Sequence, residues 1–160
     1  MKKVYFDNAA TTQTDKDVAA TVLEYMTNTF GNPGSVHASG REARKAVDIA
    51  REQVAKLIGA QPNEIFFTSG GTESDNISIK GVAYANRNRG KHIITSAIEH
   101  HAVLEPCEAL QKEGFDLTIL PVDEFGRVDV ETLKAAIRPD TILISVMFAN
   151  NEVGTMQPIA

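Results

Sequence analysis

From about residue 61 onward, short apolar runs alternate with stretches of helical length, and this alternation constrains the fold more than any other feature. The apolar runs of strand length lie at residues 65–68, 93–95, 117–120 and 142–148. Helical periodicity between them predicts helices at about 72–85, 102–113 and 130–137. Strands separated by helices form β-α-β units. The pattern therefore predicts an α/β fold with a mainly parallel sheet and helices on both faces.

The first 60 residues differ because they contain no clear strand. Apolar residues recur every three or four positions at 15–27 and at 40–58, which predicts two amphipathic helices. Gly59 supplies a stop for the second helix. We therefore expect an amino-terminal helical arm or subdomain at residues 1–60 and an α/β part at residues 61–160.

Composition narrows the possible partners. The 160 residues carry a formal net charge of −5, which argues against binding to the phosphate backbone of a nucleic acid. The longest mostly apolar run has eight residues, at 142–149, whereas a membrane span needs about 20. A three-residue apolar run at 4–6 is too short for a signal-peptide core. A single cysteine fits a reducing compartment, so we expect a cytoplasmic protein without nucleic-acid or membrane partners.

The first apolar run is followed by Ser-Gly-Gly-Thr at residues 69–72. In an open parallel sheet, ligands bind beyond the carboxyl ends of the strands. Two glycines before a helix let an anion approach the free N–H groups and the positive end of that helix. The same residues can form a tight turn in which Thr72 or Ser74 caps the helix, and the local sequence leaves both interpretations open. The pattern is neither a Walker A loop nor G-x-G-x-x-G.

Histidine and asparagine pairs follow two other predicted strands. His100 comes after residues 93–95 and can stack on a ring or move protons near neutral pH, although a histidine at a helix start is more often a cap. Asn150 and Asn151 follow the last strand and suit either a turn or a hydrogen bond to a ligand.

The spacing of the histidines and the cysteine argues against a metal site and against a cysteine nucleophile. Neither the adjacent histidines His100 and His101 nor the lone Cys107 has the spacing of metal ligands, so no metal site is expected. Cys107 shares the helical period of Val103 and Leu110, which indicates a core residue rather than a nucleophile.

Five segments in order resemble one enzyme family over essentially the whole chain. They are residues 7–12, 31–37, 68–76, 99–104 and 150–154, which read DNAATT, GNPGSVH, TSGGTESDN, EHHAVL and NNEVG. Together they resemble the amino-terminal part of a pyridoxal-phosphate (PLP) cysteine desulfurase of the class V aminotransferase group, of the iron–sulfur and nitrogen-fixation type. The resemblance implies a type I aminotransferase-like large domain, incomplete in this chain, with loops of residues 1–60 bordering the active site.

The resemblance also implies roles for individual residues. Gly71 and Thr72 would bind the PLP phosphate, His100 would stack on the ring and take part in proton transfer, and Asn151 would contact the cofactor and the substrate. The family converts L-cysteine to L-alanine and leaves a persulfide on the enzyme, which supplies sulfur for iron–sulfur clusters or thio-modification. A homodimer and a sulfur-acceptor protein, such as an iron–sulfur scaffold, are the implied partners.

The expected catalytic set is only partly present. In the family, the lysine that carries PLP, the persulfide cysteine and the substrate-binding arginine lie beyond the region that these 160 residues match. None of the nine lysines occurs in the family's Ser-x-His-Lys context. The family is thus expected to be enzymatic, while activity of these 160 residues alone is not expected.

Alternatives remain at this point. The chain can be a catalytically inactive truncated paralogue or a fragment that acts as a binding or dimerisation module, or a second polypeptide can complete the site. Another class V PLP enzyme, such as a selenocysteine lyase, is the nearest enzymatic alternative.

Overall fold

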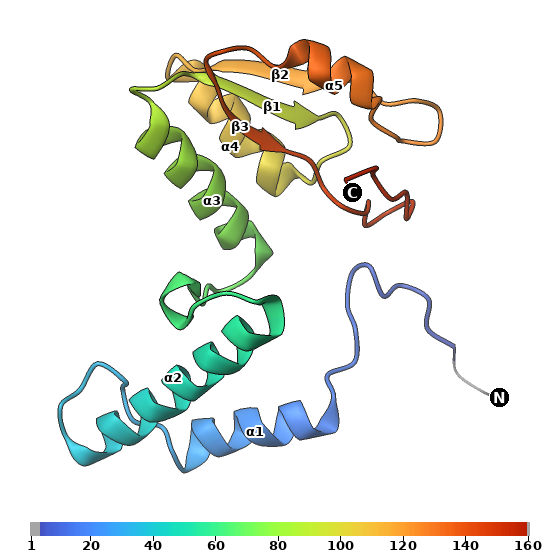
Figure 1. The fold of residues 1–160 in the computed structure, drawn as a ribbon. Helices are drawn as coiled ribbons and strands as arrows, with labels where there is room; N and C mark the ends of the chain where they lie inside the picture. The colour runs from blue at the N-terminus through green and yellow to red at the C-terminus, as the bar shows by residue number, and fades with distance from the viewer. Residues whose placement is uncertain (1–3, 160) are drawn as a thin grey trace. The chain divides into compact units, whose positions relative to one another are not determined.

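The computed structural model describes residues 4–159, which form two compact units. The first unit ends at Phe67 and the second begins at Thr68. Figure 1 shows the helices of the first unit and the small sheet of the second. The domain boundary predicted after residue 60 stays a prediction.

The first unit is helical, as the sequence predicts. Its elements are α1 (Lys16–Thr27), α2 (Ala38–Ile58) and a short 3-10 turn, η1 (Pro62–Glu64). The Asp15 carboxylate caps α1 by accepting the backbone N–H of Asp17 at 2.8 Å. Gly59 ends α2 in the left-handed region, with φ 71°.

The strand predicted at residues 65–68 does not form, so that prediction is wrong. Ile65 has extended backbone angles, φ −98° and ψ 125°, but no neighbouring strand pairs with the segment within residues 4–159. Arg51 of α2 holds it instead. The Arg51 Nε donates to the carbonyl oxygen of Ile65 at 3.2 Å, and the guanidinium lies 5.4 Å from the centre of the Phe67 ring.

The second unit is an α/β layer structure. Its elements in chain order are α3 (Gly71–Asn86), β1 (His92–Ser96), α4 (His101–Lys112), β2 (Asp116–Leu120), α5 (Val130–Ala136) and β3 (Thr141–Ser145). The strand order is β2-β1-β3, and β1 pairs in parallel with both neighbours. The predicted α/β class with a parallel sheet is therefore confirmed, with three strands in the sheet.

Neighbouring side chains of β1 enter two different cores. Ile93 packs with residues of α3 and α4, including Ile79 and Leu110. Ile94 points to the opposite face and packs with Leu120, against which Leu133 of α5 also lies. All five residues of β1 are buried. Helices therefore cover both faces of the sheet (Figure 1), and within residues 4–159 no helix combines the length and apolar character needed to cross a bilayer.

Cys107 is a core residue, as its helical period predicts. Its side chain is fully buried in the cluster formed by α3, α4 and β1. Burial raises the pKa of the Cys107 thiol to about 11, and the charges of Glu99 and Glu108 add to this effect. The thiol is therefore protonated and shielded near neutral pH.

We expect Cys107 to resist alkylation in the native protein. At pH 8 its thiolate fraction should be roughly a hundredfold lower than that of an exposed cysteine. Peptide mass spectrometry after iodoacetamide treatment measures this, with the same reaction in guanidinium chloride as the control. Equal labelling of Cys107 in native and unfolded protein would contradict the buried assignment.

His92 joins all three strands at their amino-terminal edge. Its Nδ1 lies 2.7 Å from the hydroxyl of Thr141, and its Nε2 lies 2.8 Å from the hydroxyl of Thr118. The Thr141 oxygen also accepts the backbone N–H of Arg138 at 2.8 Å, so His92 and the turn before β3 share this hydroxyl. Burial lowers the pKa of His92, and Arg138 lowers it further.

Acid should destabilise the protein through His92. The unfolded chain binds a proton at His92 more readily than the folded chain, so the free energy of unfolding should fall as the pH drops below about 6.5. His92→Asn should flatten this part of the pH dependence in denaturant titrations. His101→Asn, at an exposed position, should leave it unchanged. Equal pH slopes for the parent and His92→Asn would refute this role.

Candidate functional site

The amino terminus of α3 presents unpaired backbone donors. Within residues 4–159, nothing accepts a hydrogen bond from the backbone N–H of Gly71 or Thr72. A Cβ atom added at Gly70 or Gly71 would meet no atom within 4 Å, so the start of the helix is open. Free N–H groups at the positive end of a helix are suited to the oxygen atoms of an anion.

Glu73 removes Ser69 from this set of donors. The Glu73 carboxylate accepts the backbone N–H of Ser69 at 2.6 Å and its hydroxyl at 2.7 Å. These two bonds lower the pKa of Glu73 below its usual value. The carboxylate is therefore ionised at neutral pH. An anion at this helix end would depend on the groups of Gly71 and Thr72 rather than on Ser69.

His100 caps α4. Its Nδ1 accepts the backbone N–H of Ala102 at 3.0 Å, which places the proton of the neutral ring on Nε2. The side chain is exposed. The His101 ring lies 6.4 Å away, inclined at 66°, so the two rings do not stack face to face. The cap explanation of His100 is correct, and it leaves Nε2 available to a ligand.

Asn150 has the turn role that its sequence allows. Its Oδ1 accepts the backbone N–H groups of Glu152 and Val153, both at 2.9 Å, and its Nδ2 donates to the carbonyl oxygen of Ile98 at 3.1 Å. The neighbouring Asn151 is exposed, and no partner for its amide is recorded in the described part of the chain. Asn150 builds the turn, and Asn151 is the amide that remains for a ligand.

Glu99 is a residue of this edge that sequence reasoning missed. It is 8% exposed. Its Oε1 accepts the hydroxyl of Ser96 at 2.8 Å and the backbone N–H of Met147 at 2.7 Å. β3 ends at Ser145 rather than at the predicted residue 148, and beyond its end the Met147 N–H is bonded to Glu99 instead of to a strand. The available signal was an acidic residue between a strand and a helix, which does not distinguish a buried acceptor from an exposed acid.

The loops after β1 and β3 are therefore joined. We call residues 97–100 the β1 loop and residues 146–156 the β3 loop. Glu99 and Asn150 each form one hydrogen bond from one loop to the other. Because β1 and β3 are parallel neighbours, this brings His100 and Asn151 to the same edge of the sheet.

The start of α3 is less closely tied to that edge. The helix packs against α4 and β3. No hydrogen bond within residues 4–159 links Gly71 or Thr72 to either of the two loops. Convergence of the helix end with His100 and Asn151 stays a prediction.

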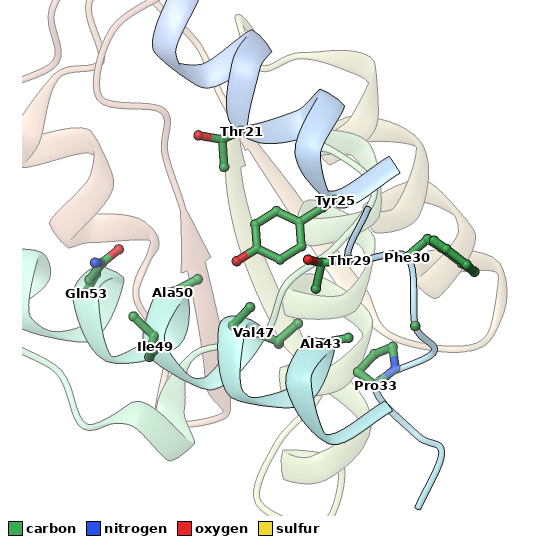
Figure 2. Close-up of a pocket in the computed structure, with 12 residues that line it drawn as sticks. Thr21, Tyr25, Thr29, Phe30, Pro33, Ala43, Val47, Ile49, Ala50 and Gln53 are labelled. Atoms are coloured by element: carbon green, nitrogen blue, oxygen red, sulfur yellow. The ribbon is translucent and has the colours of Figure 1, made fainter. Parts of the chain in front are cut away.

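A groove that contains none of these residues lies in the first unit. Figure 2 shows this groove of about 580 Å³ between α1 and α2, with Tyr25 and Thr21 facing Val47 and Ala50. Its lining residues are all uncharged, and none is a predicted site residue. Within residues 4–159, no group of three or more His, Cys, Asp or Glu side chains is arranged to hold a metal ion.

Comparison with known proteins finds similar sequences and similar solved structures. A cysteine desulfurase IscS from Methanosarcina thermophila is 58% identical over 158 residues, which cover 99% of this chain and 39% of that protein. A solved NifS-like protein superposes with a TM-score of 0.93 at 47% identity, over 98% of this chain and 43% of its own. A structure of SspA in complex with cysteine gives a TM-score of 0.90 at 42% identity, over 97% and 45%.

The chain spans about two fifths of the length of these relatives. Its match to a family model is nearly complete, however, because the model described as aminotransferase class-V matches residues 4–160. The α/β architecture and parallel sheet agree with the solved neighbours. The chain therefore belongs to the class V aminotransferases, a family of PLP-dependent enzymes.

Proposed function

We propose that this chain contributes to a cysteine desulfurase that converts L-cysteine and an enzyme thiol to L-alanine and an enzyme persulfide. The carbon–sulfur bond of the substrate breaks and a sulfur–sulfur bond forms, so the reaction needs no external oxidant. The observation that carries the proposal is 58% identity to a cysteine desulfurase over 99% of the chain. The neighbour solved in complex with cysteine supports the choice of substrate.

The donors at the start of α3 fit the phosphate of PLP. The backbone N–H groups of Gly71 and Thr72 are unpaired within the described residues, and the space above the two glycines is open. The Thr72 hydroxyl can add a third donor. When bound, PLP supplies an electron sink for the substrate carbon that loses its proton.

In the proposed site, His100 faces the ring of the cofactor, and Asn151 offers a side-chain amide to the ligand. Because Nδ1 of His100 is occupied by the N–H of Ala102, Nε2 is the atom that can exchange a proton with a ligand. The exposed imidazole also offers a flat face for a pyridine ring. The Asn151 amide can donate to a carboxylate and accept from a hydroxyl.

The sulfur nucleophile and the cofactor lysine are assigned outside these residues. Cys107 is excluded as the nucleophile because its thiol is buried and its pKa is raised to about 11. No lysine lies in the β1 loop or the β3 loop. We therefore propose that the remainder of the polypeptide, or a second chain, supplies both groups.

The proposed partners and location follow from the same family. We propose a homodimer that passes sulfur to an acceptor protein, such as an iron–sulfur scaffold, in the cytoplasm. The single cysteine supports a reducing compartment, and the net charge of −5 does not favour nucleic acid as a partner.

The complete polypeptide encoded with this chain, loaded with PLP, should release alanine from L-cysteine. With a dithiol reductant present, alanine and sulfide should appear in equal amounts. The 160 residues alone should give no turnover, because they lack the cofactor lysine and an activated thiol. Absence of alanine from the PLP-loaded complete polypeptide would refute the proposed function.

Substitution of His100 should reduce turnover much more than substitution of its neighbour. His100→Ala should lower kcat at least about a hundredfold, the usual size of a general acid–base contribution. His101→Ala is the matched control, because both side chains are exposed at the start of α4. Steady-state assays of alanine release measure both variants. Equal kcat values for the two would remove His100 from the proposed chemistry.

A further inference from the structure

Glu99 is a buried carboxylate with no charged partner within residues 4–159. Burial of an unpaired acid is costly unless its oxygens accept hydrogen bonds. Both recorded bonds converge on Oε1, one from Ser96 in the same segment and one from Met147, which is 48 positions later in the chain. The placement of Glu99 therefore serves a tertiary connection rather than local capping.

The Met147 bond occurs where the sheet ladder stops. The last paired residues of β1 and β3 are Thr95 and Ser145. Two residues later, the N–H of Met147 donates to the Glu99 carboxylate rather than to a strand carbonyl. Glu99 thus holds the backbone at Met147, two residues after the end of β3.

Asn150 adds a second connection in the opposite direction. Its Nδ2 donates to the carbonyl oxygen of Ile98, the residue before Glu99. Its Oδ1 meanwhile shapes the turn that carries Asn151, by accepting the N–H groups of Glu152 and Val153. Each connection is made by the residue directly before a candidate ligand-binding residue: Glu99 precedes His100, and Asn150 precedes Asn151.

We propose that Glu99 and Asn150 are positioning residues that clamp the β1 loop to the β3 loop, and so fix His100 relative to Asn151. This inference rests on the proposed function, since it assumes that these two side chains act on one ligand. The clamp works through hydrogen-bond geometry and not through the negative charge of Glu99. A small displacement of a reacting group can cost about two orders of magnitude in rate, so a clamp of this kind is expected beside a reaction centre.

Four variants of the complete, PLP-loaded polypeptide test the clamp. Glu99→Ala removes the acceptor, whereas Glu99→Gln keeps a carbonyl oxygen for Ser96 and Met147 and removes the charge. Asn150→Asp keeps the acceptor of the turn and loses the donor to Ile98. Glu105→Ala is the matched control, because Glu105 is an exposed acid on α4.

Three quantities are measured for each variant: kcat per folded enzyme, the dissociation constant of PLP, and deuterium exchange of peptides that contain Met147. Glu99→Ala should lower kcat at least about tenfold and speed local exchange by about tenfold. Asn150→Asp should also lower kcat, and it decides the question if Glu99→Ala does not fold. Glu99→Gln and Glu105→Ala should remain within about threefold of the parent.

Two results would overturn the clamp. The first is that Glu99→Ala or Asn150→Asp keeps the kcat and the PLP affinity of the parent although deuterium exchange at Met147 is faster. The other is faster exchange over the whole chain with kcat per folded enzyme unchanged, which indicates general stability alone. If the parent itself releases no alanine, the proposed function fails. PLP affinity and local exchange then still decide whether Glu99 and Asn150 position the two loops.

Discussion

The parallel pairing of β1 with both of its neighbours is the interaction on which the second unit depends. All five residues of β1 are buried. Ile93 packs into the core on one face of the sheet, and Ile94 packs into the core on the other face. Burial of such side chains contributes about 1.5–3 kcal/mol each. The same pairing places the ends of β1 and β3 together, so the sheet that stabilises the unit also creates the edge where His100 and Asn151 lie.

The two edges of the sheet use polar side chains for the same purpose. At the amino-terminal edge, His92 bonds to Thr118 and Thr141 across all three strands. At the other edge, Glu99 joins the β1 loop to the β3 loop, and Gln157 donates to the carbonyl oxygen of Gly126 at 2.7 Å. Polar groups can be buried at these positions because each finds partners on neighbouring strands or loops. The loops of the candidate site are therefore held by long-range bonds.

This explains which features the sequence could predict. The helices of both units and the strands of the second unit were predictable because their signals are local: apolar periodicity in each element, and Gly59 at the end of α2. The absence of a strand at residues 65–68 was not predictable, because an apolar run forms a strand only when another strand pairs with it. In residues 4–159 the Arg51 side chain is its partner instead.

The same distinction applies to the candidate site. His100 and the pair Asn150 and Asn151 could be selected because they follow strands of the sheet, whereas Gly71 follows residues 65–68, which form no strand. Glu99 could not be, because its role is defined by an N–H 48 positions away. Asn150 and Asn151 are adjacent and identical, and only the structure separates the one that builds the turn from the one that is exposed.

Charge balance shows how much of a PLP site these residues can provide. The donors at the start of α3 are neutral N–H groups and a hydroxyl, and the positive end of a helix is equivalent to about half an elementary charge. Glu73, ionised and within the first turn, opposes a bound anion. No lysine or arginine lies among residues 68–76 to offset the charge of a phosphate. In the proposed site, residues 68–76 would therefore offer only neutral donors to a phosphate, and any cationic partner of that phosphate would come from outside this segment.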